Sequence, residues 1–328
     1  MATATPFAAE RRALCSAALA APWLLGACAM PLTAALPAAG EVGVPVEVAA
    51  GVYMLQGASG EAAPENAGRV GNAGFIVGPA GVVVVDSGTS YQEGVALLAS
   101  IRRITSQPVR LLLLTHTRQE FLFGAAAFAE QRIPVQMQTQ AARLMAARCE
   151  GCLKALKRLL GEEAMRGTTV VKPDILFDAD TTLDLIGRPL RLLHFGHSSG
   201  PGDVAVLDER TGVLFAGGLL DHERIPDVQD SRLPGWHQAL AALASLPLRR
   251  IVPGHGPVAG PGLVGTVTQY LQQLESRAQA LVKAGAALSE VPAATHLPHF
   301  EGWDQYETIH RRNASVVFLR LEQAQLAL

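Results

Sequence analysis

The sequence has almost no net charge. Among its 328 residues, 27 lysines and arginines stand against 29 aspartates and glutamates, which gives a formal charge of −2 at pH 7. This balance argues against a basic surface for nucleic acid and against an acidic solvating tail. The sequence also lacks internal repeats and long runs of one charge. We therefore predict no nucleic-acid partner.

Long apolar runs are missing too, except near the N-terminus. After residue 40, no segment reaches the ~18 uninterrupted apolar residues that a membrane-spanning helix needs. Before it, Arg11 and Arg12 precede a small-residue apolar stretch typical of an export signal. We therefore predict an export signal at residues 1–40, an exported, periplasmic protein, and a single domain with C-terminal helices at residues 41–328.

The end of this apolar stretch leaves three alternatives. The run Leu25–Cys28 resembles a bacterial lipobox, in which Cys28 would be lipidated and would attach the mature protein to a membrane. The same site suits an ordinary signal peptidase. An uncleaved N-terminal membrane anchor is the third alternative, because prolines in an apolar segment do not forbid spanning.

Cysteine is scarce in the body of the chain. Two of the four cysteines fall in the presumed signal, which leaves only Cys149 and Cys152. A zinc knuckle would need a second ligand pair, and none exists. In an oxidising periplasm the pair would close a small disulfide ring. Unreactive thiols on a helix and a catalytic redox pair are the alternatives.

What the sequence does have is enough apolar material for a large core. Its hydrophobic content is 49%, and from about residue 44 short β-rich runs alternate with helical ones. The predicted strands are 52–56, 74–77, 82–86, 110–114, 134–137, 174–177, 182–186, 190–194, 204–207, 213–216 and 250–252. The predicted helices are 91–104, 122–131, 140–160, 236–245, 263–284 and 304–324. Two such halves predict an α/β fold, a four-layer αββα sandwich.

Several predicted strands end in loops with metal-site character. Thr115–Phe121 follows an apolar run, and Gly196–Ser198, Phe215–Gly218 and Pro253–Gly256 follow in order. These four spaced motifs resemble the metallo-β-lactamase superfamily along most of the chain. The resemblance implies the αββα fold and zinc-dependent hydrolysis at two adjacent zinc ions, which would lower the pKa of a water and polarise the attacked bond.

The resemblance assigns the zinc ligands of the family to particular positions of this sequence, and only some of the residues there can bind zinc. The first site would use His116, Arg118 and His197, the second Glu120, Phe121 and His255, with Gly218 where a bridging aspartate is expected. Arginine has only donors and stays protonated, so Arg118 cannot ligate a cation. Phe121 and Gly218 offer no donor atom, and Glu120 carries one methylene too many. We predict that the dinuclear centre is largely lost.

Two hypotheses follow for what remains. In one, His116 and His197, with Glu120 or His255, hold a single zinc ion, at most one per chain, and the protein is a single-zinc hydrolase. In the other, no cofactor is bound, and Arg118 neutralises the carboxylate of Glu120 in place of the metal. The retained histidines would then be structural hydrogen-bonding residues.

Other polar residues near these motifs have weaker roles. Asp221 and His222 lie just after Gly218 and would either supply lost metal donors or belong to an ordinary surface loop. Asp203 would orient the imidazole of His197 or simply start a strand. His194 and His237 are expected to be packing or capping residues. A C-terminal group would form either a substrate-covering lid or a structural cover: His296, His299, Trp303, Tyr306 and His310.

Within the superfamily, a second set of motifs resembles the quinoprotein relay system zinc metallohydrolases, which are related to the SoxH-like proteins. The motifs are Cys149–Leu153, Leu160–Thr168, Arg224–Pro226, Asp230 and Gly235–Trp236. This resemblance implies an exported hydrolase-like protein associated with a pyrroloquinoline-quinone dehydrogenase system, with either a component of that system or a small molecule as partner. A thiol or disulfide protein using Cys149 and Cys152 is a further alternative.

Overall fold

The computed structural model describes residues 43–326, and all of them belong to one compact unit. The predicted export signal at residues 1–40, with Cys28, therefore lies outside the described residues. Within the described part of the chain, no helix combines the length and apolarity needed to cross a membrane.

The first half of the domain builds a seven-stranded sheet, sheet A, with its strands in sequence order. Its first strands pair antiparallel, and β4 to β7 pair parallel. The central strand β4 is buried along its whole length, as expected for the continuous apolar run of a strand covered on both faces. The strands are β1 (Pro45–Ala49), β2 (Val52–Leu55), β3 (Ala73–Gly78), β4 (Gly81–Val85), β5 (Val109–Leu114), β6 (Val135–Gln138) and β7 (Ile175–Phe177).

The second half builds a five-stranded sheet, sheet B, in the order β12-β11-β10-β9-β8. Its pairs are antiparallel except for β11 and β12, which run parallel. The strands are β8 (Thr181–Leu183), β9 (Leu190–His194), β10 (Val204–Asp208), β11 (Val213–Phe215) and β12 (Arg250–Val252).

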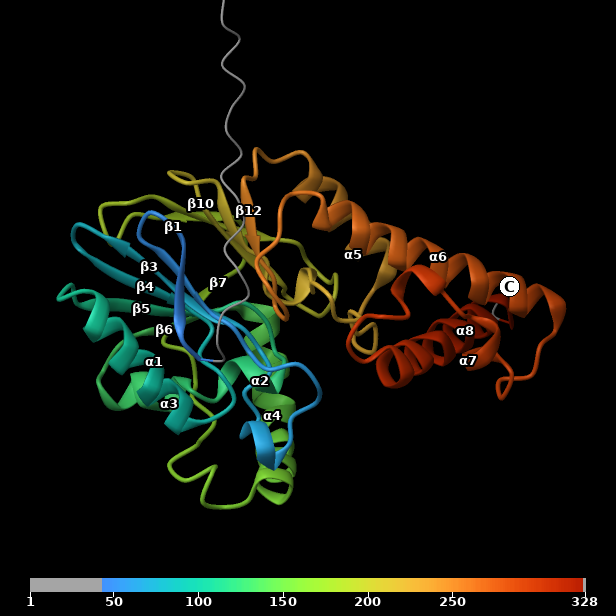
Figure 1. Cartoon of the computed structure of the whole chain (residues 1–328), viewed down its shortest axis with the longest axis horizontal. Helices are drawn as coiled ribbons and strands as arrows, with labels where there is room; N and C mark the ends of the chain where they lie inside the picture. The colour runs from blue at the N-terminus through green and yellow to red at the C-terminus, as the bar shows by residue number, and fades with distance from the viewer. Residues whose placement is uncertain (1–42, 327–328) are drawn as a thin grey trace, which may run out of the picture. The chain divides into compact units, whose positions relative to one another are not determined.

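Helices cover the outer face of each sheet, as Figure 1 shows for α1 and α3 beside sheet A. One apolar cluster joins sheet A to α1, α3 and α4, a second joins sheet B to α5, α6 and α8, and a third lies between the sheets. The predicted four-layer αββα sandwich is thereby confirmed. The long helices are α1 (Tyr91–Ile104), α3 (Ala125–Glu130), α4 (Thr139–Leu160), α5 (Leu233–Ala244), α6 (Leu263–Ala284) and α8 (Arg311–Leu326).

Shorter helical turns connect these elements, and several of them border the site described below. They are η1 (Pro64–Asn66), α2 (Gln119–Leu122), η2 (Gly217–Leu219), α7 (Val291–Ala294), η3 (Pro298–Phe300) and η4 (Tyr306–His310). The helix predicted over 122–131 is two helices, α2 and α3, because the chain turns at Gly124. A Cβ on Gly124 would lie 1.9 Å from the carbonyl oxygen of Ser87.

A fully buried ion pair joins the two sheets. Arg188 donates to both carboxylate oxygens of Asp208 at the end of β10, at 2.7 and 2.6 Å, and the side chains are 2% and 0% exposed. The same guanidinium donates to the carbonyls of Ala50 and Val77 at 3.0 Å. Because Val77 belongs to β3 and Ala50 to the turn between β1 and β2, the pair ties sheet A to sheet B, and these two sheets carry the loops of the site.

Candidate functional site

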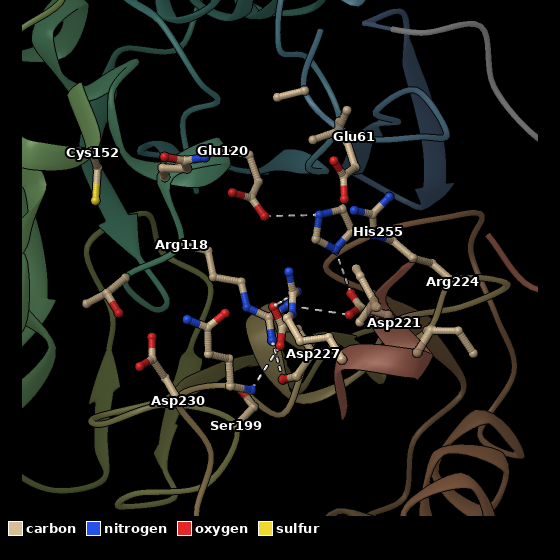
Figure 2. A pocket seen from close by; sticks show the side chains of 18 of the residues that line it. Glu61, Arg118, Glu120, Cys152, Ser199, Asp221, Arg224, Asp227, Asp230 and His255 are labelled. Carbon is tan, nitrogen blue, oxygen red and sulfur yellow. Dashed lines mark hydrogen bonds and ion pairs between the residues drawn. The ribbon is translucent and has the colours of Figure 1, made fainter. Parts of the chain in front are cut away.

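The loops that follow β5, β11 and β12 meet in one cavity of about 490 Å³. Charged side chains dominate its lining, and Figure 2 shows how they converge. The charged lining residues are Glu61, Arg118, Glu120, Asp221, Arg224, Asp227, Asp230, His255 and Arg312. The cavity therefore lies where the sequence predicts a metal centre.

Arg118 makes its ion pair with Asp221 and not with the predicted partner Glu120. Its Nη1 lies 3.5 Å from Oδ2 of Asp221, and its Nη2 donates to the carbonyl of Asp227 at 3.1 Å. Asp221 is only 1% exposed, so the surface-loop alternative for this residue is wrong. Burial alone would raise the pKa of Asp221, but His255 and Arg118 together lower it to about 2.

His255 lies between two carboxylates. Its Nδ1 is 2.8 Å from Oδ1 of Asp221, and its Nε2 is 3.4 Å from Oε1 of Glu120. The second contact is an ion pair without hydrogen-bond geometry, since Nε2 has no hydrogen-bond partner within the described residues. Burial would lower the pKa of His255, but Asp221 and Glu120 raise it. Because ionised carboxylates only accept hydrogen bonds, we assign both ring nitrogens as protonated.

Glu120 completes a charge-balanced group. Burial would raise its pKa, but His255 and then Arg118 lower it to about 2. Two cations, Arg118 and His255, thus lie against two carboxylates, Glu120 and Asp221. Their charges cancel without any metal ion. We call these four residues the internal ion-pair network.

His116 has a different environment and a different charge. Its Nδ1 lies 2.7 Å from Oγ1 of Thr115, whose hydroxyl donates to Asp86 at 2.8 Å. The hydroxyl proton points to Asp86, so Nδ1 of His116 is the donor and Nε2 carries the lone pair. Burial, with Arg118 second, lowers the pKa of His116 to about 3. The ring is neutral, and its buried Nε2 has no partner among residues 43–326.

Phe121 fills the space between the two site histidines. Its ring centroid lies 4.4 Å from that of His116 and 5.2 Å from that of His255. The ring is accommodated by Gly71, where a Cβ would lie 2.8 Å from Cε1 and Cζ of Phe121. An apolar ring therefore occupies the position from which a ligand would reach the second metal.

Gly218 leaves no room for the aspartate that the resemblance implies. A Cβ there would lie 2.9 Å from Cδ2 of His116 and 2.9 Å from Oγ of Ser199. The bare backbone at this position allows His116 and Ser199 to pack closely. A bridging carboxylate at this position would require the neighbours to move.

The residues present do not fit the dinuclear zinc centre implied by the resemblance. Zinc sites need at least three protein donors, and residues 43–326 hold no group of three or more His, Cys, Asp or Glu side chains able to bind a metal ion. The guanidinium of Arg118, which cannot ligate, lies among the remaining donors. The predicted grouping of His116 and His197 with Glu120 or His255 is also not formed.

His197 and His222 use their ring nitrogens elsewhere. Nε2 of His197 donates to the carbonyl of Asp230 at 2.7 Å, and Nδ1 of His222 donates to the carbonyl of Pro257 at 2.9 Å. Neither lines the cavity. A metal-ligand role for either histidine has no support in this structure, because neither lies with the other candidate ligands at the cavity and no metal-binding group is found within residues 43–326. His197 thus has the structural hydrogen-bonding role of the second hypothesis, and His222 makes a hydrogen bond of the same kind.

Asp203 shapes the loop of His197 without contacting its ring. Its Oδ2 accepts from Oγ of Ser198, Oγ of Ser199 and the backbone nitrogen of Gly200, at 2.8, 2.7 and 2.8 Å. The prediction that Asp203 orients the imidazole of His197 is therefore wrong. The carboxylate instead closes the turn on which His197 lies.

The remaining histidines lie outside the cavity lining. His310 donates to Thr295 at 3.0 Å and stacks on Tyr306 with ring centroids 4.4 Å apart, which agrees with a structural cover and not a lid. The others have these contacts: His194 with Gln138 and Asp203, His237 with Glu275, His296 with Tyr306, and His299 with Phe300. Trp303 packs against the sheet B core.

The predicted disulfide is not formed, since Cys149 and Cys152 are free thiols. Both lie in the middle of α4, where Cys149 packs into the sheet A core and Cys152 lines the cavity. Burial, and then the neighbouring Cys152, raises the pKa of Cys149 to about 12. A buried, protonated thiol is a poor nucleophile, which argues against a catalytic redox pair.

We expect the two thiols to differ sharply in reactivity. Cys152 should react quickly with a small disulfide reagent, because it borders the cavity, whereas Cys149 is 2% exposed and should react only on unfolding. Replacing Cys152 with serine in the full chain should remove one fast-reacting thiol, as counted by absorbance. The matched variant Cys149→Ser should remove none, and the reverse pattern would contradict this assignment.

Sequence reasoning missed Asn72, which anchors the loop of His255. Its Nδ2 donates to the carbonyls of Pro253 and Gly256 at 2.9 and 2.8 Å, and its Oδ1 accepts from Gly57 at 2.9 Å. No motif identifies such a residue, because its partners lie about 180 positions away. Arg224, Asp227 and Arg312, which line the cavity, were missed for the same reason.

Replacing Asn72 with alanine is expected to lower the free energy of unfolding by about 2 kcal/mol, because buried backbone groups lose their partners. Urea denaturation measures the change. Asn66 is a matched control, since its side chain also makes three hydrogen bonds, but within a partly exposed local turn. We expect Asn66→Ala to cost less than about 1 kcal/mol. Equal losses would show that Asn72 does not hold this loop.

The fold and this arrangement of loops define the class of protein. The sequence profile described as the metallo-beta-lactamase superfamily matches residues 67–255, which is more than half of the chain. The protein therefore belongs to the metallo-β-lactamase superfamily.

Among curated proteins, it is similar to a linear primary-alkylsulfatase from a Pseudomonas species. The two are 22% identical over 271 residues, which is 71% of this chain and 51% of the relative. The chain thus spans about half the length of that relative.

Solved structures agree on the fold. A metallo-β-lactamase from Pontibacter korlensis matches with a TM-score of 0.57 and 22% identity, covering 70% of this chain and 98% of that one. A double mutant of the sec-alkyl sulfatase PisA1 matches with a TM-score of 0.66 and 16% identity, covering 85% and 50%. The metallo-β-lactamase FIM-1 from Pseudomonas aeruginosa, in a mono-zinc form, gives 0.55 and 21%, covering 70% and 95%. At these identities the likeness concerns the fold alone.

Proposed function

We propose that this protein is a metal-free, non-hydrolytic member of its superfamily that binds a small molecule in the cavity. The observation that carries the proposal is the pairing of Arg118 with Asp221, 3.5 Å apart, where the resemblance implies zinc. Without a cation to lower the pKa of a water or polarise a bond, the ancestral hydrolysis has no catalyst. Binding remains, because the cavity persists with a fixed set of charged groups.

The internal ion-pair network explains how the loops hold their shape without zinc. A metal would have neutralised the buried carboxylates, and here Arg118 and His255 do so. Phe121 fills the volume between the histidines. Arg118 and Phe121, which replace metal ligands of the family pattern, thus stabilise the metal-free site together.

One observation favours the alternative, a single-zinc hydrolase. The Nε2 atoms of His116 and His255 are both buried without a hydrogen-bond partner within residues 43–326. Two imidazoles with free nitrogens could contribute to a metal site if Glu120 joined them. Against this, His255 Nε2 faces a carboxylate that favours its protonated form, and protonated imidazole does not ligate.

Metal analysis decides between the two. Purified protein is incubated with excess zinc, passed through a desalting column and analysed by elemental mass spectrometry. We expect a zinc content far below one ion per chain, unchanged in His116→Ala. A content of about one tightly held ion, removed by His116→Ala, would establish the single-zinc alternative.

We further propose that the protein is exported and serves as an accessory to a quinoprotein dehydrogenase system. The support is the export-signal composition of residues 1–40 and the resemblance of Cys149–Leu153 and Leu160–Thr168 to quinoprotein relay proteins. Fractionation of cells tests export, and the lipobox version predicts that Cys28→Ser releases the protein from membranes. Deleting the gene should lower quinone-dependent dehydrogenase activity, and unchanged activity would remove the quinoprotein assignment.

A further inference from the structure

The arginines of the cavity have more hydrogen-bond donors than partners. A guanidinium carries five N–H donors, and Arg118 donates only to Asp221 and Asp227 within the described residues. Arg312 donates only one side-chain hydrogen bond in the same range, to Oδ2 of Asp227 at 2.7 Å. Both guanidiniums therefore converge on Asp227 and keep unused donors at the cavity wall.

Four of the five carboxylates that line the cavity already contact a cation. Asp221 and Glu120 contact His255, and Asp227 contacts Arg312. Asp230 contacts Arg148 at 2.9 Å, outside the cavity lining. Glu61 lines the cavity and is exposed, and it forms no ion pair with a cation among residues 43–326. Within residues 43–326, the spare donors of Arg118 and Arg312 make no hydrogen bond to any of these carboxylates.

The segment 226–231, which carries the shared acceptor Asp227, is held by side chains of α8. Asn313 donates to the carbonyl of Pro226 at 2.7 Å and accepts from the nitrogen of Val228 at 3.1 Å. Arg320 donates to the carbonyls of Gln229 and Ser231 at 2.6 and 3.0 Å. Arg118 and Arg312 thus both donate to an acceptor residue on a well-held segment, and the fork of a guanidinium suits a planar or tetrahedral oxyanion.

The cavity also has an apolar side. Val70, Leu159, Ile225 and Ile309 line it beside the arginines. A ligand with an anionic head and a short apolar body would contact both parts of the lining. A purely cationic ligand would meet guanidiniums and an imidazolium, and Glu61 is the lining carboxylate without an ion pair within the described residues.

We propose that the cavity binds a small molecule through an anionic oxygen group, a carboxylate, sulfate or phosphate, with Arg118 and Arg312 as donors. This inference rests on the proposed function, since it assigns the ligand class of the same metal-free cavity. Arg118 thus takes over from the metal both the neutralisation of a buried carboxylate and the attraction of an anion. No bond is made or broken in this step.

Calorimetric titration of the full chain tests the inference, with hexanoate and inorganic phosphate as probes. We expect hexanoate to bind, and its amine counterpart hexylammonium not to bind. Arg118→Gln should weaken hexanoate binding by about 10- to 100-fold, the loss expected for hydrogen bonds to a charged group. If phosphate binds with the same affinity as hexanoate, the cavity recognises the oxyanion alone. If hexanoate binds more tightly than phosphate, the apolar part of the lining contributes to the affinity.

Two further variants serve as controls. Arg312→Gln changes a side chain that is 44% exposed and should weaken binding without unfolding the domain. Arg191 does not line the cavity and lies 3.6 Å from Glu209, with which it forms an ion pair. Arg191→Gln should therefore leave the affinity unchanged. Unchanged affinity in both Arg118→Gln and Arg312→Gln, or tighter binding of hexylammonium, would overturn the inference. Zinc content is measured on the same preparation, so zinc-free protein that binds no anion refutes the ligand class and not the proposed function.

Discussion

Replacing His255 with leucine is expected to lower the free energy of unfolding by about 3–5 kcal/mol, because removing one partner of a buried ion pair leaves uncompensated charge. The variant would leave Asp221, 1% exposed, and Glu120, 16% exposed, with Arg118 as their nearest cation. Leucine roughly keeps the volume of the imidazole, so packing contributes little to the loss. Equilibrium unfolding in guanidinium chloride measures it.

His222→Leu is the matched control for this substitution. His222 directly follows Asp221 in the sequence, but its ring is held only by a hydrogen bond to the carbonyl of Pro257 within the described residues. We expect a loss of about 1 kcal/mol. Losses of equal size in the two variants would mean that His255 is an ordinary hydrogen-bonding residue and not a cation in a network.

The stability difference between wild type and His255→Leu should depend on pH. The pKa of His255 is raised in the fold, so its contribution is complete below the unfolded value and is lost as pH rises through the folded pKa. The pKa values of Asp221 and Glu120 are lowered to about 2, so their contribution is present above their unfolded values and is lost as pH falls. The difference should therefore be largest between about pH 4.5 and 6.5. A difference that stays constant from pH 5 to pH 9 would contradict the charge assignment.

The second large effect is a gain of metal binding. The double variant Arg118→His, Phe121→His returns donors at two of the lost positions and removes the guanidinium charge. With His116, His255 and Glu120 in place, we expect about one zinc ion per chain, because at least three donors then surround one position. Elemental analysis after desalting measures this gain against the wild type.

The matched control for the rebuilt site is Arg118→Leu, Phe121→Leu, which removes the guanidinium and the ring but adds no donor atom. We expect this variant to bind no zinc. If the leucine variant bound the same amount of zinc as the histidine variant, the charge of Arg118 alone would explain why the wild type excludes the ion. If neither bound zinc, the missing carboxylate at Gly218 would be the limiting loss.

Much of the fold was predictable because apolar periodicity is a local property. The helix predicted over 263–284 has the same bounds in the structure, and the strand Arg250–Val252 is also found as predicted. The C-terminal helix was predicted to begin at Asp304, but residues 306–310 form a wider turn before α8 begins at Arg311. Such a turn depends on the packing of Tyr306 and His310 against the core, which no local pattern encodes.

The loss of metal ligands at the candidate site was predictable, because it depends on the chemistry of single side chains. An arginine, a phenylalanine and a glycine cannot ligate zinc, and this follows from their atoms alone. The partners could not be predicted in the same way. Arg118 contacts Asp221, 103 positions away, and not the nearby Glu120, while His197 turns to the carbonyl of Asp230. These choices depend on how loops from the two sheets meet.

The most direct test is a crystal structure of the protein soaked in zinc, with anomalous scattering recorded at the zinc absorption edge. The account predicts no anomalous peak between His116 and His255, with the guanidinium of Arg118 beside Asp221 and the ring of Phe121 between the two imidazoles. One or two strong peaks at that position, with Arg118 displaced and His116 or His255 as ligands, would contradict it.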